Sequence, residues 1–393
     1  MWPLKKALSR STAPRTPAPI TLDDPALFRD PYALYARLRA AGPVAEVHPG
    51  GYLLLSHRDV SGALANPDLG NAPSRFSALN KRFRATRVSA DLAANILPFL
   101  DPPEHTAPRR ALAKAFGARF KALGPQLEPI AARMVADVPP GKTEVISRLS
   151  SPFAIRVMTR FLGLADETGA DLKPYTESFF RLFAPLSDPV VMERVNVDLV
   201  GFRTYLAARM AAGEVAAEGL LAQAGDLSPE ALIDNAILLF ADGIENIERG
   251  TATILRVLAR EGALGRAPLK PLIPEALRLE TPAQVIARVV RQETDVAGRR
   301  LAPGTPVFLG LGAANRDPSA FEDAERFRPG RVEEGLTFGR GRHSCMGSVL
   351  AAAQFEALIG ALTARGIDVP DQKVRYLPRA GHLWPESLII TLA

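Results

Sequence analysis

Apolar residues recur at helical spacing along much of the chain. Residues 31 to 41 carry apolar side chains three and four positions apart and stop at Gly42-Pro43, which predicts a helix followed by a breaker. Residues 101 to 265 show the same period in runs of Ala, Leu, Arg and Glu, and they predict a large helical lobe. Within this lobe, residues 231 to 255 predict one long apolar helix interrupted by a few polar residues.

Strand patterns are short and lie mainly outside this lobe. Residues 44 to 47 and 52 to 56 flank a His-Pro-Gly-Gly turn, so they predict a β-hairpin. Apolar runs at 307 to 311 and 387 to 392 predict further strands, and helical spacing returns between 345 and 364. The pattern therefore predicts a mainly α fold with a small β part.

The composition is that of a folded protein, with 47% hydrophobic and 23% charged residues. Residues 1 to 24 are rich in Ser, Thr, Pro and Arg and predict a flexible arm, whereas residues 25 to 393 contain no repeat or linker and predict a single domain. A net charge of +6 is mild for 393 residues and does not indicate nucleic-acid binding. Since the N-terminal residues lack a long apolar segment, we expect a cytoplasmic protein without a membrane anchor.

Cys345 is the only cysteine of the chain, which excludes an intramolecular disulfide. A lone cysteine is most often an inert core residue. This one stands just before a predicted helix, where unpaired backbone N–H groups favour thiolate over thiol. Gly341 and Gly347 leave room for a flat macrocycle near the backbone, and Phe338 can keep water from the sulfur.

The segment from Phe338 to Gly347 resembles the haem-binding signature of the cytochrome P450 family, Phe-x-x-Gly-x-x-x-Cys-x-Gly, at all four fixed positions. The alternative is a glycine-rich loop with an incidental cysteine. The resemblance implies a cytochrome P450-like fold, a haem b cofactor, and Cys345 as the axial thiolate ligand of its iron.

Three further segments match the family in the same order. Glu275 and Arg278 are three apart on a predicted helix and can pair, and the resemblance adds Arg331 as the third member of a buried charge network. Taken alone, such a pair is usually solvated. The segment 311–318 resembles a family segment for which we expect an architectural role.

The third match, in the segment 101–110, places His105 and Arg109 four apart on one predicted helical face. The resemblance assigns His105, Arg109, Arg288 and His343 to the two haem propionates, for which such side chains are suitable partners. A solvated basic face is the alternative. Pro108 departs from the family pattern, and we expect it to bend the first helical turn.

The long apolar helix carries Asp242-Gly243-Ile244-Glu245-Asn246 where the family has Ala/Gly-Gly-x-Asp/Glu-Thr. By resemblance, Gly243 lets the helix bulge and leaves room for dioxygen, Glu245 supplies protons, and Asn246 positions water but cannot relay a proton as a hydroxyl does. Asp242 lies one turn before Asn246. It either faces the pocket and binds a basic or hydroxylated part of the substrate, or is a surface carboxylate or part of a local salt bridge.

The function implied is that of a haem-thiolate monooxygenase, which uses dioxygen to hydroxylate or oxidatively demethylate a small organic molecule in secondary metabolism or catabolism. Because the chain shows no flavin or iron-sulfur segment, we expect electrons from a separate ferredoxin or flavodoxin. Asn246 leaves open an atypical enzyme that is peroxide-driven, desaturating, ring-forming or coupling. A non-catalytic haem sensor or carrier is a further alternative, against which the Gly243–Glu245 pair speaks.

Two basic clusters suggest partners. Residues 75 to 87 contain five Arg and Lys residues, which either face an anionic substrate or an acidic carrier protein or are simply solvated. Arg340 and Arg342 lie beside the cysteine and can dock an acidic electron-transfer protein. The segment 246–275 is shorter than the family usually has, so we expect one peripheral helix to be abbreviated.

Overall fold

The helices follow the apolar periods of the sequence. The computed structural model describes residues 19–71, 87–166, 169–182, 188–266 and 268–393. Its α-helices are α1 (Ala26–Arg29), α2 (Pro31–Ala41), α3 (His57–Ala65), α4 (Val88–Leu92), α5 (Thr106–Leu123), α6 (Leu127–Ala136), α7 (Ser151–Leu162), α8 (Gly169–Arg181), α9 (Pro189–Ala211), α10 (Leu220–Gln223), α11 (Pro229–Arg260), α12 (Leu272–Leu279), α13 (Leu311–Ala314) and α14 (Ser348–Arg365). A π-helical turn, Ile146–Ser150, leads into α7.

The strands form small sheets. They are β1 (Val44–Glu46), β2 (Tyr52–Leu54), β3 (Leu69–Gly70), β4 (Gly141–Glu144), β5 (Val285–Val290), β6 (Thr294–Val296), β7 (Arg299–Leu301), β8 (Pro306–Gly310), β9 (Ile367–Asp368) and β10 (Ile389–Leu392). One sheet has the order β1-β2-β8-β5-β3, in which β2 and β8 are parallel and the other pairs antiparallel. A second has the order β4-β10-β9, and β6 pairs with β7.

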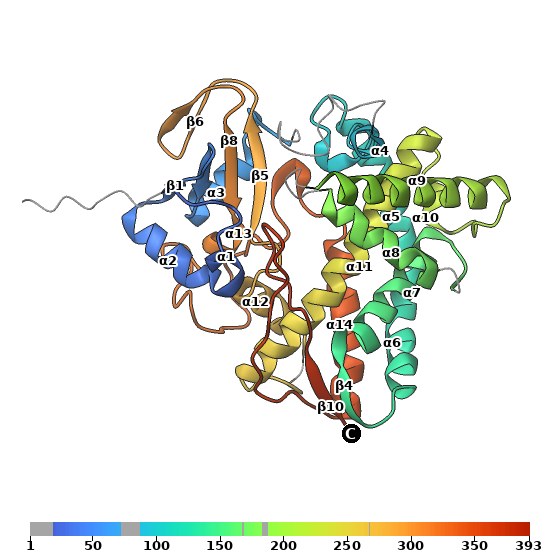
Figure 1. Cartoon of the computed structure of the whole chain (residues 1–393). Coiled ribbons are helices and arrows are strands. Elements are labelled where there is room, and N and C mark those ends of the chain that lie inside the picture. Colours follow the sequence, from blue (N-terminus) through green and yellow to red (C-terminus); the bar gives the residue numbers. More distant parts are fainter. Residues whose placement is uncertain (1–18, 72–86, 167–168, 183–187, 267) are drawn as a thin grey trace, which may run out of the picture.

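The molecule has a sheet-containing side and a helical side (Figure 1). The strands β1, β5 and β8 gather beside α2, while α5 to α9 lie on the other side and α11 runs through the middle of the molecule beside α14. The largest hydrophobic cluster is built from the helices, and residues on nearly every face of α11 belong to it. A helix apolar all round is buried on all sides, which explains why α11 is central.

Most predicted elements are confirmed. The helix at 31–41 and the hairpin of β1 and β2 lie where expected, and the long apolar segment 231–255 falls inside α11. The mainly α fold with a small β part is therefore correct. Pro108 does not bend α5, because it lies in the first turn, where backbone N–H groups have no helical partner.

The predicted N-terminal arm is too long at its C-terminal end. Residues 1–18 lie outside the described part of the chain, but Ile20 is buried, with 6% of its surface exposed, and its N–H donates to the carbonyl of Glu46 at 3.0 Å. Burial of the apolar side chain of Ile20 against the hairpin stabilises this position, whereas a flexible arm would leave the side chain exposed to water. Residues 20 to 24, which were expected to belong to the arm, are thus part of the fold.

The connection between α11 and α12 is short, as predicted. The helix α11 ends at Arg260 and α12 begins at Leu272, and the described residues between them contain no helix. Among the helices that the structure describes, none combines the length and the apolar character that crossing a membrane requires.

Candidate functional site

Cys345 lies on a loop that is held from both ends. Its N–H donates to the carbonyl of Phe338 at 2.8 Å, and α14 begins three residues later. The guanidinium of Arg342 donates to the carbonyls of Asn66 and Leu69 at 2.8 and 3.2 Å, which fastens the loop to the end of α3 and to β3. The predicted position just before a helix is therefore correct.

The thiol of Cys345 is surrounded by protein and still accessible. Protein atoms enclose it on nearly every side, yet a water molecule can reach the residue. An enclosed but accessible sulfur is what a ligand to a large prosthetic group requires.

The helix start favours the thiolate of Cys345, as expected, but burial has the larger effect on the pKa of the thiol. The N–H groups of Gly347 and Ser348 do lower its pKa, and so does the charge of Arg109. Burial outweighs them and raises the pKa of the thiol, and the negative charge of Asp242 raises it further.

The two glycines of the loop have different surroundings. A β-carbon on Gly347 would meet only the sulfur of Cys345, at 3.8 Å, so this glycine does keep space beside the sulfur. A β-carbon on Gly341 would lie 3.1 Å from the carbonyl of Leu64, and its φ of +75° favours glycine. The expectation that Gly341 makes room for a macrocycle is thus wrong, because its open side faces α3.

The residues predicted to hold the propionates lie together. The rings of His105 and His343 are 4.4 Å apart between centroids, and Nε2 of His105 is buried without a partner among the described residues. Burial, followed by the nearby groups of His343 and Arg109, lowers the pKa of His105 to about 4. A histidine so placed is ready to donate to an anion.

Arg288, on β5, is the most enclosed cation of this group. Only 9% of its surface is exposed, and its one hydrogen bond within the described residues goes to the carbonyl of Ala287 at 2.8 Å. Burial lowers the pKa of the guanidinium to about 10. The guanidinium of Arg109 donates to the carbonyl of Ser344 at 2.8 Å and acts on the charge of Cys345.

These cations and donors fit the two carboxylates of haem b. One carboxylate of the protein, Asp101, lies among them, 3.4 Å from Nε2 of His343, and it accepts from the N–H of Asn71. A single carboxylate does not balance the charges of both Arg109 and Arg288. The buried Nε2 of His105, which has no partner among the described residues, can donate to a carboxylate of the haem.

The predicted charge network is present. Both oxygens of Glu275 accept from Arg278, at 2.7 and 2.8 Å, and Oε1 also accepts from Arg331 at 3.0 Å. Arg278 and Glu275 are buried, so this is not the solvated pair of the alternative interpretation. Arg278 lowers the pKa of Glu275 enough to outweigh the effect of burial.

The segment 311–318 has the expected architectural role. The carbonyl of Asn315 accepts from Arg278 at 2.6 Å, and its side-chain oxygen accepts from the N–H of Leu336 at 2.6 Å. Its amide nitrogen donates to Thr281 and Thr337. Asn315 thereby joins α12 to the chain that leads to the cysteine loop.

The distal motif does not have the predicted geometry at Gly243. The helix α11 is continuous from Pro229 to Arg260, with no bulge. A β-carbon on Gly243 would lie 2.5 Å from the sulfur of Met158. The missing side chain therefore lets α7 approach α11, and the expectation that it makes room for dioxygen is wrong.

Glu245 is engaged in an ion pair. Its Oε1 accepts from Lys173 of α8 at 2.6 Å and from the hydroxyl of Thr176 at 2.9 Å. Lys173 also contacts Glu248 at 3.1 Å. Although burial alone would raise the pKa of Glu245, Lys173 lowers it below its usual value. In this structure Glu245 is a charged partner of α8. The sequence did not predict this ion pair, and the role of Glu245 in supplying protons stays a prediction.

Asp242 and Asn246 lie one turn apart on α11. The carboxyl of Asp242 is enclosed by protein, and its burial raises its pKa to about 7. It is near enough to Cys345 for its charge to raise the pKa of the thiol. The side-chain amide of Asn246 donates to the carbonyl of Asp242 at 3.1 Å. Asp242 is therefore not a surface carboxylate, and its role in binding substrate stays a prediction.

An aromatic cluster near α8 was not predicted. The ring of Trp384 lies 4.5 Å from that of His382 and 5.1 Å from that of Phe180. Burial lowers the pKa of His382 to about 4. In the sequence, this cluster is indicated only by His382 and Trp384, which lie two positions apart in the C-terminal segment. Phe180 is distant in sequence and reaches them only in the folded protein.

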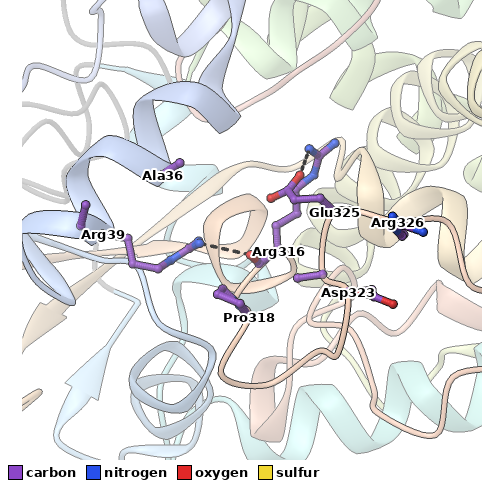
Figure 2. Close-up of a pocket in the computed structure, with 9 residues that line it drawn as sticks. Ala36, Arg39, Arg316, Pro318, Asp323, Glu325 and Arg326 are labelled. Carbon is purple, nitrogen blue, oxygen red and sulfur yellow. Dashed lines mark hydrogen bonds and ion pairs between the residues drawn. The ribbon is translucent and has the colours of Figure 1, made fainter.

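A separate surface groove of about 570 Å³ lies between α2 and the loop after α13 (Figure 2). Arg39 donates to the carbonyl of Arg316 at 3.1 Å, and Arg316 pairs with Glu325 at 2.6 Å, so these groups satisfy one another. None of the predicted site residues lines this groove. Its polar groups join two segments, and they present no group of acids, bases or nucleophiles that would do chemistry.

Comparisons with known proteins agree with this site. The family model for cytochrome P450 matches residues 268–364, which include the charge network and the cysteine loop. The chain is 30% identical to cytochrome P450 107B1 of Saccharopolyspora erythraea, over 91% of this chain and 93% of that protein. It is 28% identical to 6-deoxyerythronolide B hydroxylase of the same organism, over 89% and 93%.

A solved structure shares the fold. P450BioI in complex with hexadec-9Z-enoic acid ligated acyl carrier protein has a TM-score of 0.82 and 24% identity, over 93% of this chain and 99% of that one. The chain belongs to the cytochrome P450 family and is an oxidoreductase of the monooxygenase type, with haem b bound through the thiolate of Cys345, its only cysteine.

Proposed function

We propose that this protein is a haem-thiolate monooxygenase that hydroxylates or oxidatively demethylates a small organic substrate. The observation that carries the proposal is the enclosed but accessible sulfur of Cys345, which lies near enough to Asp242 of α11 for the carboxylate charge to raise the pKa of the thiol. Haem, when bound, supplies the iron at which dioxygen is activated. The protein supplies the sulfur ligand, an enclosed space and polar groups on α11.

Each predicted haem contact has a role in this proposal. The propionates bind to Arg109, Arg288, His105 and His343, because these residues lie together and Nε2 of His105 has no partner among the described residues. Phe338, whose carbonyl accepts from the N–H of Cys345, excludes water from the sulfur. The open space at Gly347 lets the macrocycle approach.

On the other side of the site, α11 orients water rather than relaying protons through a hydroxyl. The side-chain nitrogen of Asn246 donates to the helix backbone, so its side-chain oxygen remains to accept a hydrogen bond from water or substrate. Glu245 is bound to Lys173 and would have to leave that pair to move a proton. The side chains of Glu245 and Asn246 thus offer no ready route for protons to this site.

That feature favours a second candidate, an atypical enzyme driven by hydrogen peroxide, which brings its own protons. The test compares turnover with peroxide and turnover with a ferredoxin system, in the natural protein and in Asn246→Thr. A peroxide-driven enzyme turns over with peroxide alone, and Asn246→Thr does not improve it. Faster turnover of Asn246→Thr with ferredoxin supports the dioxygen-dependent reaction instead.

Gly243 and Glu245 do not speak against a haem sensor or carrier. The open side of Gly243 faces Met158, and Glu245 is paired with Lys173, so the two residues form no proton route in this structure. The monooxygenase assignment rests on the family and on the site instead.

The expected partners follow from the surface and the relatives. We propose a separate ferredoxin or flavodoxin as electron donor, docking near Arg340, whose side chain is exposed and donates to Ser61 at 3.0 Å. Arg342 is held by backbone carbonyls and contributes less. A related structure contains an acyl carrier protein, which supports an acidic carrier as a further partner. Most of the basic segment 75–87 proposed to meet it lies outside the described residues.

The decisive measurement is the absorption spectrum of the reduced, carbon-monoxide-bound protein. A thiolate ligand shifts the main haem band far to the red of the histidine-ligated form. We expect this band in the natural protein, its loss in Cys345→Ser, and its retention in Met346→Leu, which removes the neighbouring sulfur. A histidine-type band in the natural protein would refute the proposal.

A further inference from the structure

The haem-facing side of α11 carries an acid without a partner. The carboxyl of Asp242 is surrounded by protein, yet its side chain is partly accessible to water-sized probes, as for Cys345. Among the described residues it forms no hydrogen bond or ion pair, and burial is the only influence on its pKa. Buried carboxylates in proteins are usually paired, so one that is not calls for a ligand.

The direction of this carboxyl follows from its neighbours. Asp242 and Asn246 remain partly accessible on a stretch of α11 that is otherwise largely buried, so both side chains border a space. The sulfur of Cys345 is accessible too, and the charge of Asp242 reaches it, so the carboxyl lies on the side of α11 that is turned toward the cysteine loop. A substrate held between α11 and the haem would contact it.

The next turn of the helix presents the same kind of group. Because the side-chain nitrogen of Asn246 donates to the carbonyl of Asp242, only its oxygen remains for a ligand. Residues four apart share a helix face, so the two side chains offer acceptors one turn apart. Such a surface favours a ligand with positive charge and rejects anions.

We propose that Asp242 is a specificity-determining residue that binds a cationic nitrogen of the substrate, so that the substrates are small organic amines or ammonium compounds. This inference rests on the proposed function and names the substrate class of that site. A cation beside the carboxylate removes the cost of an unpaired buried charge, and it holds the substrate at a set position on α11. A neutral hydroxyl would leave most of that cost in place.

A pair of probes of equal shape tests the charge alone. Trimethylphenylammonium and tert-butylbenzene differ in one central atom, and the quaternary nitrogen has no lone pair with which to bind iron. Their dissociation constants are measured by calorimetry on the haem-loaded protein. We expect the ammonium compound to bind at least about tenfold more tightly to the natural protein.

Two variants locate the effect. Asp242→Asn keeps the size of the side chain and should reduce the preference to about onefold, with Asp242→Ala in its place if the first variant does not load haem. Glu230→Gln, at an exposed position at the start of the same helix, should keep the preference.

Two results would overturn the inference: equal affinity for both probes in the natural protein, or an ammonium preference that persists without the carboxyl. Each preparation is first checked for the red-shifted carbon-monoxide band. With that band present, failure concerns Asp242 alone, and without it the proposed function fails.

Discussion

The cysteine side of the site and the α11 side were built under different constraints. Around Cys345, the predicted propionate partners His105, Arg109, Arg288 and His343 come together from distant parts of the chain. On α11, two of the four predicted residues serve packing or an ion pair, and the other two depart from the family pattern.

The difference shows that a sequence motif predicts the positions of its residues well where all of them contact one rigid group, here the haem. A thiolate ligand and two propionates impose residue types and places together. A helix presents its residues all around its axis, so neighbours in sequence face different elements. The residue type at a helical position does not say which element it will meet.

The largest effect is expected at the network that supports the cysteine side. Glu275→Gln leaves Arg278 and Arg331 buried without their anion, which should lower the free energy of unfolding by about 3–5 kcal/mol. Chemical denaturation measures this, with Glu322→Gln as an exposed control. Because the folded pKa of Glu275 is lowered, its contribution is present above its unfolded pKa and is lost as pH falls through the folded pKa.

Asp242→Asn should produce a smaller, pH-dependent gain in stability. The pKa of Asp242 rises from 3.8 when unfolded to about 7 when folded, so the folded protein holds a proton longer and loses stability as pH rises between these values. The variant escapes this loss, and its advantage should grow between these pH values, by at most about 4 kcal/mol, and stay constant above about pH 7. Denaturation curves at several pH values, with no ligand added, test this; an advantage independent of pH would contradict it.

Arg288→Gln should weaken haem retention without unfolding the protein. Loss of one charged propionate partner should speed haem transfer to an acceptor protein about tenfold, equivalent to about 1.4 kcal/mol. Arg291→Gln, just beyond the same strand and more exposed, should have little effect. Equal rates in the two variants would remove Arg288 from the propionate site.

The smallest effect separates packing from dioxygen binding at Gly243. Gly243→Ala places a β-carbon against Met158, and the strain, less the gain in helix propensity, should cost about 1 kcal/mol. Met158→Ala in the same protein should relieve the strain. The affinity of the reduced protein for carbon monoxide should stay unchanged, and a marked fall in that affinity would restore the earlier interpretation.

Prediction from sequence succeeded where the interacting residues are close together in the chain, or where the apolar spacing of a helix is repeated over many residues. The helix at 31–41, the central helix, the cysteine loop and the Glu275–Arg278 pair all follow from residues close together in sequence. It failed at Ile20, where the missing information was a contact with the hairpin formed by later residues.

The sequence alone determined the fold class, the family and the iron ligand, because a lone cysteine in a fully matched loop leaves one candidate sulfur. Only the tertiary structure decided which way the residues of α11 face. Met158 and Lys173 lie on other helices, and their packing assigns Gly243 and Glu245 to those helices and leaves Asp242 toward the haem side. The physical reason is that burial and pairing depend on what surrounds a residue in space.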